Sequence, residues 1–159
     1  MRFDENKRNL LRRSTLNLTG QLLPWIKNKE QFITQCTQCG DCQLACPENI
    51  IVKGDGGFPK INFNLGECNF CGKCAQSCAL PLFNPINSTP WTIKAMITDD
   101  CLANKSVYCR SCAESCQTLA LSFKIGIRAV PEIDLSLCNG CGGCVAPCPT
   151  QSISMKDLA

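Results

Sequence analysis

The sequence contains no histidine. This absence excludes haem held by a proximal histidine, Rieske centres, histidine-ligated zinc, and hydrolases that use a histidine base. The chain also lacks the glycine-rich loops that hold nucleotide phosphates, and it has no run of about 18 apolar residues that would form a transmembrane helix. The sequence therefore offers no catalytic residues for an organic substrate, and we expect a protein that is not an enzyme.

Hydrocarbon for a core is scarce. The 159 residues include only seven Phe, two Trp and one Tyr, and 16 cysteines are counted within the 45% that is apolar. Small folds with thin apolar cores need covalent or metal cross-links to offset the conformational entropy of the chain. The composition therefore predicts that cysteines supply those cross-links.

A cysteine-rich small chain is either a secreted disulfide protein or a metalloprotein. Arg12 and Arg13 form a twin-arginine pair, but polar residues interrupt the segment that follows, so it contains no apolar stretch of ~7–15 residues and no A-x-A cleavage site. We therefore predict a cytoplasmic metalloprotein. Residues 1–29 form a basic N-terminal segment, which is either a solvated tail or a segment that docks onto a partner.

The cysteines fall into four groups of four. Groups one, two and four have the spacing C-x2-C-x2-C-x3-C, whereas group three is opened to C-x7-C-x2-C-x3-C. The groups are, in order, Cys36, Cys39, Cys42 and Cys46; Cys68, Cys71, Cys74 and Cys78; Cys101, Cys109, Cys112 and Cys116; Cys138, Cys141, Cys144 and Cys148.

This spacing is typical of proteins that bind [4Fe-4S] clusters. In two-cluster ferredoxins the first three cysteines of a group ligate one cluster, and the fourth ligates the other. A zinc site would use separated pairs of cysteines, and the tight spacings do not suit disulfides. Four sites are therefore predicted: site 1, Cys36, Cys39, Cys42 and Cys78; site 2, Cys68, Cys71, Cys74 and Cys46; site 3, Cys101, Cys109, Cys112 and Cys148; site 4, Cys138, Cys141, Cys144 and Cys116.

The number of clusters depends on group three. If the x7 loop delivers Cys101, the chain holds four clusters, and otherwise it holds three. Four clusters with their thiolates would change the formal net charge from +3 to about −5. The basic composition therefore does not predict a nucleic-acid-binding surface.

The segments between the groups predict two similar modules. Two β-prone runs separated by a turn join groups one and two, and a similar pair joins groups three and four. Alternating apolar residues in 91–98 predict a strand that could pair with the closing segment 152–155. We expect an α+β fold of two bacterial-ferredoxin-like modules with short strands and short helices, residues 30–84 and 91–159, joined by a proline-rich linker at 85–90.

The sequence resembles the NapF family of ferredoxin-type proteins, which are accessory proteins of the periplasmic nitrate reductase system. The resemblance begins at Pro24-Trp25, continues through QCTQCGDCQLACP, ECNFCGKCAQSC and LCNGCGGCVAPCP, and includes the x7 spacing of DDCLANKSVYCRSCAESC, which ordinary ferredoxins lack. Arg12-Arg13 matches a basic pair in that family. The resemblance implies a cytoplasmic protein that contacts the precursor of the catalytic molybdenum subunit before export and helps to insert or reduce its iron–sulfur centre.

Three functions are compatible with these observations. The first is maturation of the nitrate reductase precursor, by supplying electrons or cluster components. The second is general electron transfer between a reductase and a respiratory enzyme. The third is a periplasmic redox subunit that uses Arg12-Arg13 as its signal. We expect the first.

Overall fold

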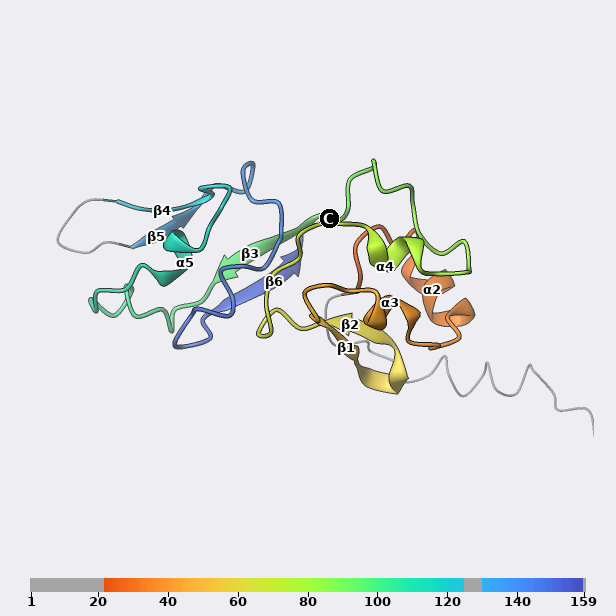
Figure 1. Ribbon diagram of the computed structural model, residues 1–159. Helices are drawn as coiled ribbons and strands as arrows, with labels where there is room; N and C mark the ends of the chain where they lie inside the picture. Colours follow the sequence, from red (N-terminus) through yellow and green to blue (C-terminus); the bar gives the residue numbers. More distant parts are fainter. Residues whose placement is uncertain (1–21, 125–129, 159) are drawn as a thin grey trace, which may run out of the picture.

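The computed structural model describes residues 22–124 and 130–158 (Figure 1). Arg12 and Arg13 lie outside these residues. The described elements are α2 (Lys29–Gln35), α3 (Asp41–Leu44), β1 (Ile51–Lys53), the 3-10 turn η1 (Asp55–Gly57), β2 (Pro59–Ile61), α4 (Lys73–Gln76), β3 (Ile93–Ile97), α5 (Ser111–Glu114), β4 (Leu121–Phe123), β5 (Pro131–Ile133) and β6 (Ile153–Asp157). The predicted fold class, short helices mixed with short strands, is confirmed.

The strands of the described residues form three antiparallel pairs. The hairpin β1–β2 connects groups one and two, and β4–β5 connects groups three and four. Strand β3 pairs with β6, so that Ala95 lies opposite Met155. The structure thus contains both predicted hairpins and the predicted pairing between the start and the end of the second half.

A short helix carries the third cysteine of each of the first three groups. Helices α3 and α4 follow Gly40 and Gly72, whose φ angles of 91° and 72° lie in the left-handed region. Glycine enters this region without the steric cost that a Cβ atom brings. Each helix has only four residues, includes the third cysteine of its group and ends before the fourth.

The largest apolar core spans both halves of the chain and includes sulfur. Strand β3 contributes Ile93 and Ala95, while Cys74, Cys112 and Cys144 are buried in the same core. A smaller cluster consists of Phe32, Phe58 and Leu82, next to α2. Three of the buried side chains in the main core are therefore predicted metal ligands rather than hydrocarbon.

Trp25 ties the segment before α2 to the proline-rich segment. Its side chain is 3% exposed, and its Nε1 donates to the carbonyl of Ser88 at 2.9 Å. The Trp25 amide donates to the carbonyl of Pro90, and the Asn84 amide donates to the carbonyl of Trp25, both at 2.6 Å. The sequence assigned these segments to an N-terminal segment and a linker, and the structure packs them against each other. The predicted domain boundaries stay a prediction.

Within residues 22–124 and 130–158, no helix is both long enough and apolar enough to cross a membrane.

Candidate metal centres

Four cavities in the structure are each lined by four cysteines. In every case three cysteines come from one group and the fourth from the other group of the same half of the chain. The sets are Cys36, Cys39, Cys42 and Cys78; Cys46, Cys68, Cys71 and Cys74; Cys101, Cys109, Cys112 and Cys148; Cys116, Cys138, Cys141 and Cys144. The structure thus brings together the residues of each predicted site, and their role as ligands stays a prediction.

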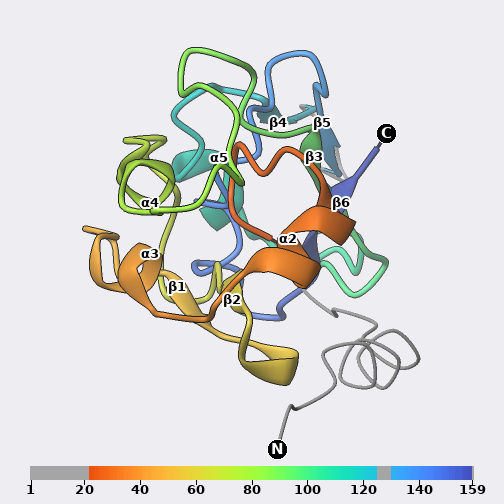
Figure 2. The ribbon, with the colours of Figure 1, turned by 90° about the vertical axis from the view of Figure 1, so that its right-hand side faces the viewer.

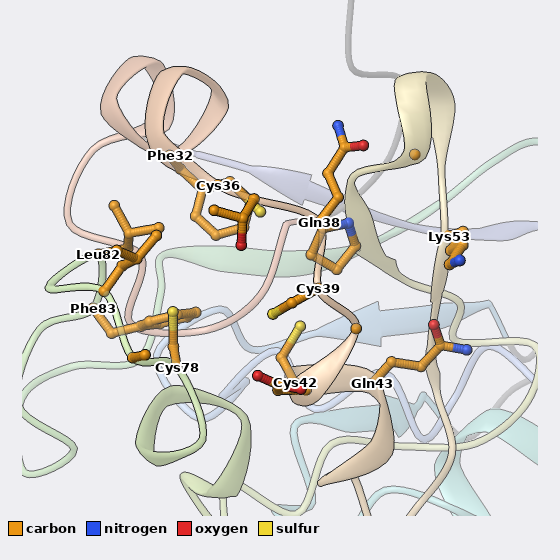
Figure 3. A pocket seen from close by; sticks show the side chains of 17 residues that line it. Phe32, Cys36, Gln38, Cys39, Cys42, Gln43, Lys53, Cys78, Leu82 and Phe83 are labelled. Atoms are coloured by element: carbon orange, nitrogen blue, oxygen red, sulfur yellow. The ribbon is translucent and has the colours of Figure 1, made fainter.

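Site 1 lies between α2, α3 and the end of α4. Figure 3 shows Cys36, Cys39 and Cys42 on the loop of group one, with Cys78 approaching from the opposite side. The space between the side chains at this site, including the part open to solvent, is about 610 Å³, compared with about 340, 330 and 320 Å³ at sites 2, 3 and 4. Phe32 and Phe83 form one wall, with their rings edge to face at 6.1 Å. Site 1 is therefore the most spacious of the four.

Sites 2 and 4 have apolar walls in the centre of the molecule. Ile51 and Ile61 line site 2, next to Trp25, while Leu121 and Met155 line site 4. Apolar walls of this kind limit the access of water to a bound metal centre. The hairpin β1–β2 thus covers site 2, and β4 and β6 cover site 4.

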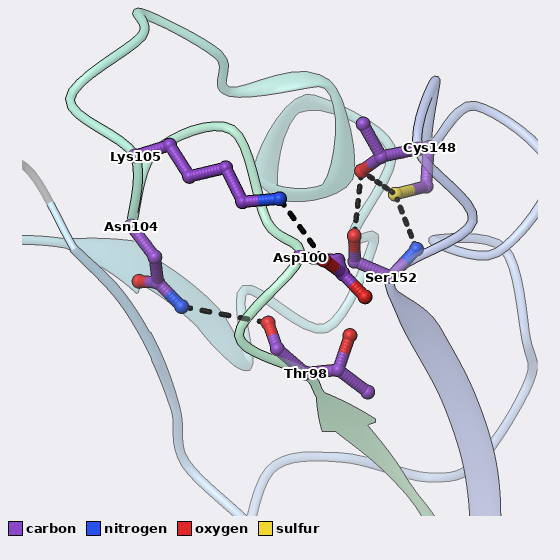
Figure 4. A network of polar contacts seen from close by, with 7 residues as sticks. Thr98, Asp100, Asn104, Lys105, Cys148 and Ser152 are labelled. Atoms are coloured by element: carbon purple, nitrogen blue, oxygen red, sulfur yellow. Dashed lines mark hydrogen bonds and ion pairs between the residues drawn. The ribbon is translucent and has the colours of Figure 1, made fainter.

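The x7 loop of group three delivers Cys101 to site 3. The Cys101 amide donates to the carbonyl of Thr98 at 3.2 Å, which fixes the turn directly after β3. Asn104 donates to the same carbonyl at 3.4 Å, and Lys105 pairs with Asp100 at 2.9 Å on the surface (Figure 4). The insertion therefore forms an ordered turn of its own, and Cys101 lines the same cavity as Cys148.

Burial opposes ionisation of the central thiols. Burial, with a smaller contribution from neighbouring thiols, raises the pKa of Cys42 and Cys68 to about 11 and that of Cys74 and Cys144 to about 12. A thiol must lose its proton to act as a metal ligand, so binding a cation here releases protons. These sites therefore favour a positively charged group that compensates several thiolates at once.

The fourth cysteine of each group lines the site formed by the other group of its half, and we call these four residues the crossing cysteines. Two of them have a lowered pKa instead of a raised one. At Cys116 burial acts to raise the pKa, but a hydrogen bond from the hydroxyl of Thr118 and several backbone amides outweigh it and lower the pKa. The Thr118 oxygen lies 3.6 Å from the sulfur. Cys148 behaves in the same way, because the Ser152 amide donates to its sulfur at 3.3 Å and Thr150 lies 3.8 Å away (Figure 4).

The motif behind these hydrogen bonds is C-x-T, and sequence reasoning missed it. It occurs at Cys116-Gln117-Thr118 and at Cys148-Pro149-Thr150, whereas Cys46 and Cys78 are followed two positions later by Glu48 and Leu80. Only the crossing cysteines of the second half therefore have a threonine at this position. Hydrogen bonds to the sulfurs of an iron–sulfur centre are among the factors that set its reduction potential.

The donor sets fit [4Fe-4S] clusters. Four cysteine thiolates around a cavity are the ligands of such a cluster. In the part of the chain that the structure describes, no three Cys, Asp or Glu side chains are placed to hold a single metal ion.

Comparisons with known families identify the same cofactor. Residues 35–80 match a 4Fe-4S dicluster domain, residues 130–153 match a 4Fe-4S binding domain, and residues 1–51 match a further 4Fe-4S dicluster domain. The chain therefore carries several [4Fe-4S]-binding regions, and the predicted cofactor type is confirmed.

Similar proteins cover nearly the whole chain. The ferredoxin-type protein NapF of Escherichia coli (strain K12) is 39% identical, and the alignment covers 99% of this chain and 98% of that protein. Ferredoxin-type protein NapF of Haemophilus influenzae is 43% identical over 89% of this chain and 82% of its own length. The methylamine utilization ferredoxin-type protein MauM of Methylophilus methylotrophus is 28% identical over 80% of this chain and 66% of its own length.

The crossed arrangement of the cysteines predicts which substitutions act on the same cluster. Cys78→Ser should remove the same component of the EPR spectrum of the reduced protein as Cys36→Ser, because both side chains line site 1. Cys71→Ser is the control, and it should remove a different component because Cys71 lines site 2. Each variant should lose about four irons per chain. Loss of the same component in Cys78→Ser and Cys71→Ser would contradict the arrangement.

Thr118 should tune the cluster at site 4. Thr118→Val removes the hydroxyl next to the Cys116 sulfur, so the reduced, more negative cluster loses a stabilising hydrogen bond and its potential should fall by roughly tens of mV. An EPR-monitored redox titration measures the shift, with the site 4 component identified as the one lost in Cys138→Ser. In the control Thr34→Val, the lost hydroxyl donates to the carbonyl of Glu30 on α2, and the potential should not change. An equal shift in both variants, or none in Thr118→Val, would refute this role.

Proposed function

The chain belongs to the NapF family of ferredoxin-type iron–sulfur proteins, which are electron-transfer or accessory proteins rather than enzymes, and from this premise we propose that it acts in the maturation of the periplasmic nitrate reductase catalytic subunit. The partner is the precursor of that subunit in the cytoplasm, before export. The observation that carries the proposal is the similarity to the NapF proteins, which covers 99% of this chain in one case and therefore spans all four cysteine groups. The resemblance predicted from the sequence is thereby confirmed at the level of the family.

The chemistry of the sites supports a role in supplying electrons. A [4Fe-4S] cluster, when bound, exchanges single electrons. The chain's own contribution is to hold the iron with sixteen thiolates, to surround sites 2 and 4 with apolar side chains, and to donate hydrogen bonds to the thiolates of Cys116 and Cys148. We propose four clusters, because Cys101 lies with the other three cysteines of site 3.

The exposed cysteines indicate where a partner would approach. Cys39 of site 1 and Cys71 of site 2 are exposed, whereas Cys74, Cys112 and Cys144 are buried. A metal centre exchanges electrons with another protein most readily where its ligands reach the surface. The first half of the chain therefore offers the more accessible sites for a precursor protein.

A binding and activation experiment tests the proposal. The cluster-loaded protein, immobilised without oxygen, should retain the nitrate reductase precursor, and a strain that lacks this protein should have reduced nitrate reductase activity. Activation of the precursor should require about one equivalent of the protein. If the precursor is not retained and the deletion strain has wild-type activity, the proposal is wrong. Activation by catalytic amounts without a stable complex would instead show a general electron carrier.

A further inference from the structure

We infer that the four sites lie in a single row in the order 1, 2, 4, 3, and that the loops of groups two and four form the joint at its centre. The inference rests on the proposed occupancy of all four sites by clusters. The crossing cysteines already pair the sites within each half. Cys46 and Cys78 link sites 1 and 2, while Cys116 and Cys148 link sites 3 and 4. The contacts between the two halves of the chain decide which site of one half lies next to which site of the other.

A backbone hydrogen bond joins site 2 directly to site 4. The Cys68 amide donates to the carbonyl of Cys141 at 2.8 Å. These two residues are themselves predicted ligands, so the loops that enclose the two sites touch at the ligands. A single hydrogen bond between two predicted ligands therefore connects the two sites.

Aromatic side chains hold the two loops together. Phe70, between two ligands of site 2, packs edge to face against Trp91, with ring centroids 5.8 Å apart. Trp91 in turn donates from Nε1 to the carbonyl of Asn139, between the ligands of site 4, at 3.2 Å. Phe63 packs on the same Trp91 ring at 6.1 Å. The joint is thus a packed interface and not a single hydrogen bond.

A polar contact closes the same joint on the side of group three. Gln117, next to the crossing cysteine Cys116, donates from its side-chain amide to the carboxylate of Glu67 at 2.8 Å. Glu67 directly precedes Cys68 in the sequence. The segment that leads into site 2 is therefore hydrogen-bonded to the neighbour of one site 4 ligand, Cys116, and to a second site 4 ligand, Cys141.

Gly142 shows how closely the loops approach. A Cβ atom at this position would lie 2.0 Å from the ring of Phe63, which no real contact permits. Gly40 occupies the same motif position in group one and has a similar φ, 91° against 80° for Gly142, but a Cβ there would meet nothing within 4 Å. The backbone strain of a substitution is therefore comparable at the two positions, and only Gly142 lies in the joint.

The two remaining sites lie at opposite ends of the molecule. In Figure 1, α2 and α3 of site 1 lie at one end, α5 and β4 of site 3 lie at the other, and the pair β3–β6 lies between them. Figure 2 views the molecule from the end that carries α2 and α3. The joint therefore turns two separate pairs of sites into one row with two ends.

Two double variants test the order of the sites. Cys39→Ser with Cys109→Ser should leave clusters at sites 2 and 4, and Cys71→Ser with Cys141→Ser should leave clusters at sites 1 and 3, each with about eight irons per chain. The reduced EPR spectrum of the first variant should be broadened by magnetic coupling between neighbouring clusters. The second should show two isolated signals. Isolated signals in the first variant, or equal coupling in both, would overturn the inference.

Hydrogen exchange on the loaded single variants tests the joint without removing any ligand. Gly142→Ala should speed exchange of the Cys68 amide by on the order of tenfold, because the bond to Cys141 opens more often. Gly40→Ala should leave that amide unchanged, because a Cβ atom there meets nothing within 4 Å. Equal exchange in the two glycine variants would overturn the joint. Failure of this inference is distinct from failure of the proposed function, because it is measured on the loaded chain without the precursor.

Discussion

Each predicted site contains at least one thiol whose ionisation the apolar surroundings oppose. Burial, together with a smaller effect of neighbouring thiols, raises the pKa of Cys74 and Cys144 to about 12. A cluster of positively charged iron removes this conflict, because it compensates several thiolates at once and bridges segments that lie far apart in the sequence. Bonds between sulfur and iron would thereby supply the stabilisation that the thin apolar core lacks. Three buried cysteines lie inside the main core itself, so the metal sites and the core are one structure.

The local features of the fold follow from the sequence because they depend on short-range chemistry. The spacing of the cysteines, with its crossing fourth member, sufficed to predict which residues line each cavity. Alternating apolar residues in β3 predicted its exposure pattern, and its pairing with β6 follows from the similar β-prone end of the chain. The sequence did not decide whether the x7 loop places Cys101 at site 3, because the length of a loop shows how far it can extend but not where it leads. Its turn is fixed by hydrogen bonds to the carbonyl of Thr98.

Contacts between distant segments could not be predicted in this way. The packing of Trp25 against the proline-rich segment depends on where two loops meet, and no periodic pattern encodes it. The same is true of the bond from Cys68 to Cys141, which joins two halves that look independent in the sequence. The hydroxyl of Thr118 near Cys116 is local, and a C-x-T motif after two of the four groups was visible in the sequence. The motif alone does not show that the hydroxyl contacts a sulfur, and only the structure places it beside a predicted ligand.

The central claim is that iron–sulfur clusters, rather than hydrocarbon, organise this chain. Iron and acid-labile sulfide analysis of protein purified without oxygen, combined with scattering measurements before and after chelation, tests it most directly. The account predicts about 16 irons and about 16 sulfides per chain, and expansion of the chain when a chelator removes the iron. Colourless, iron-free protein that remains natively compact would contradict it.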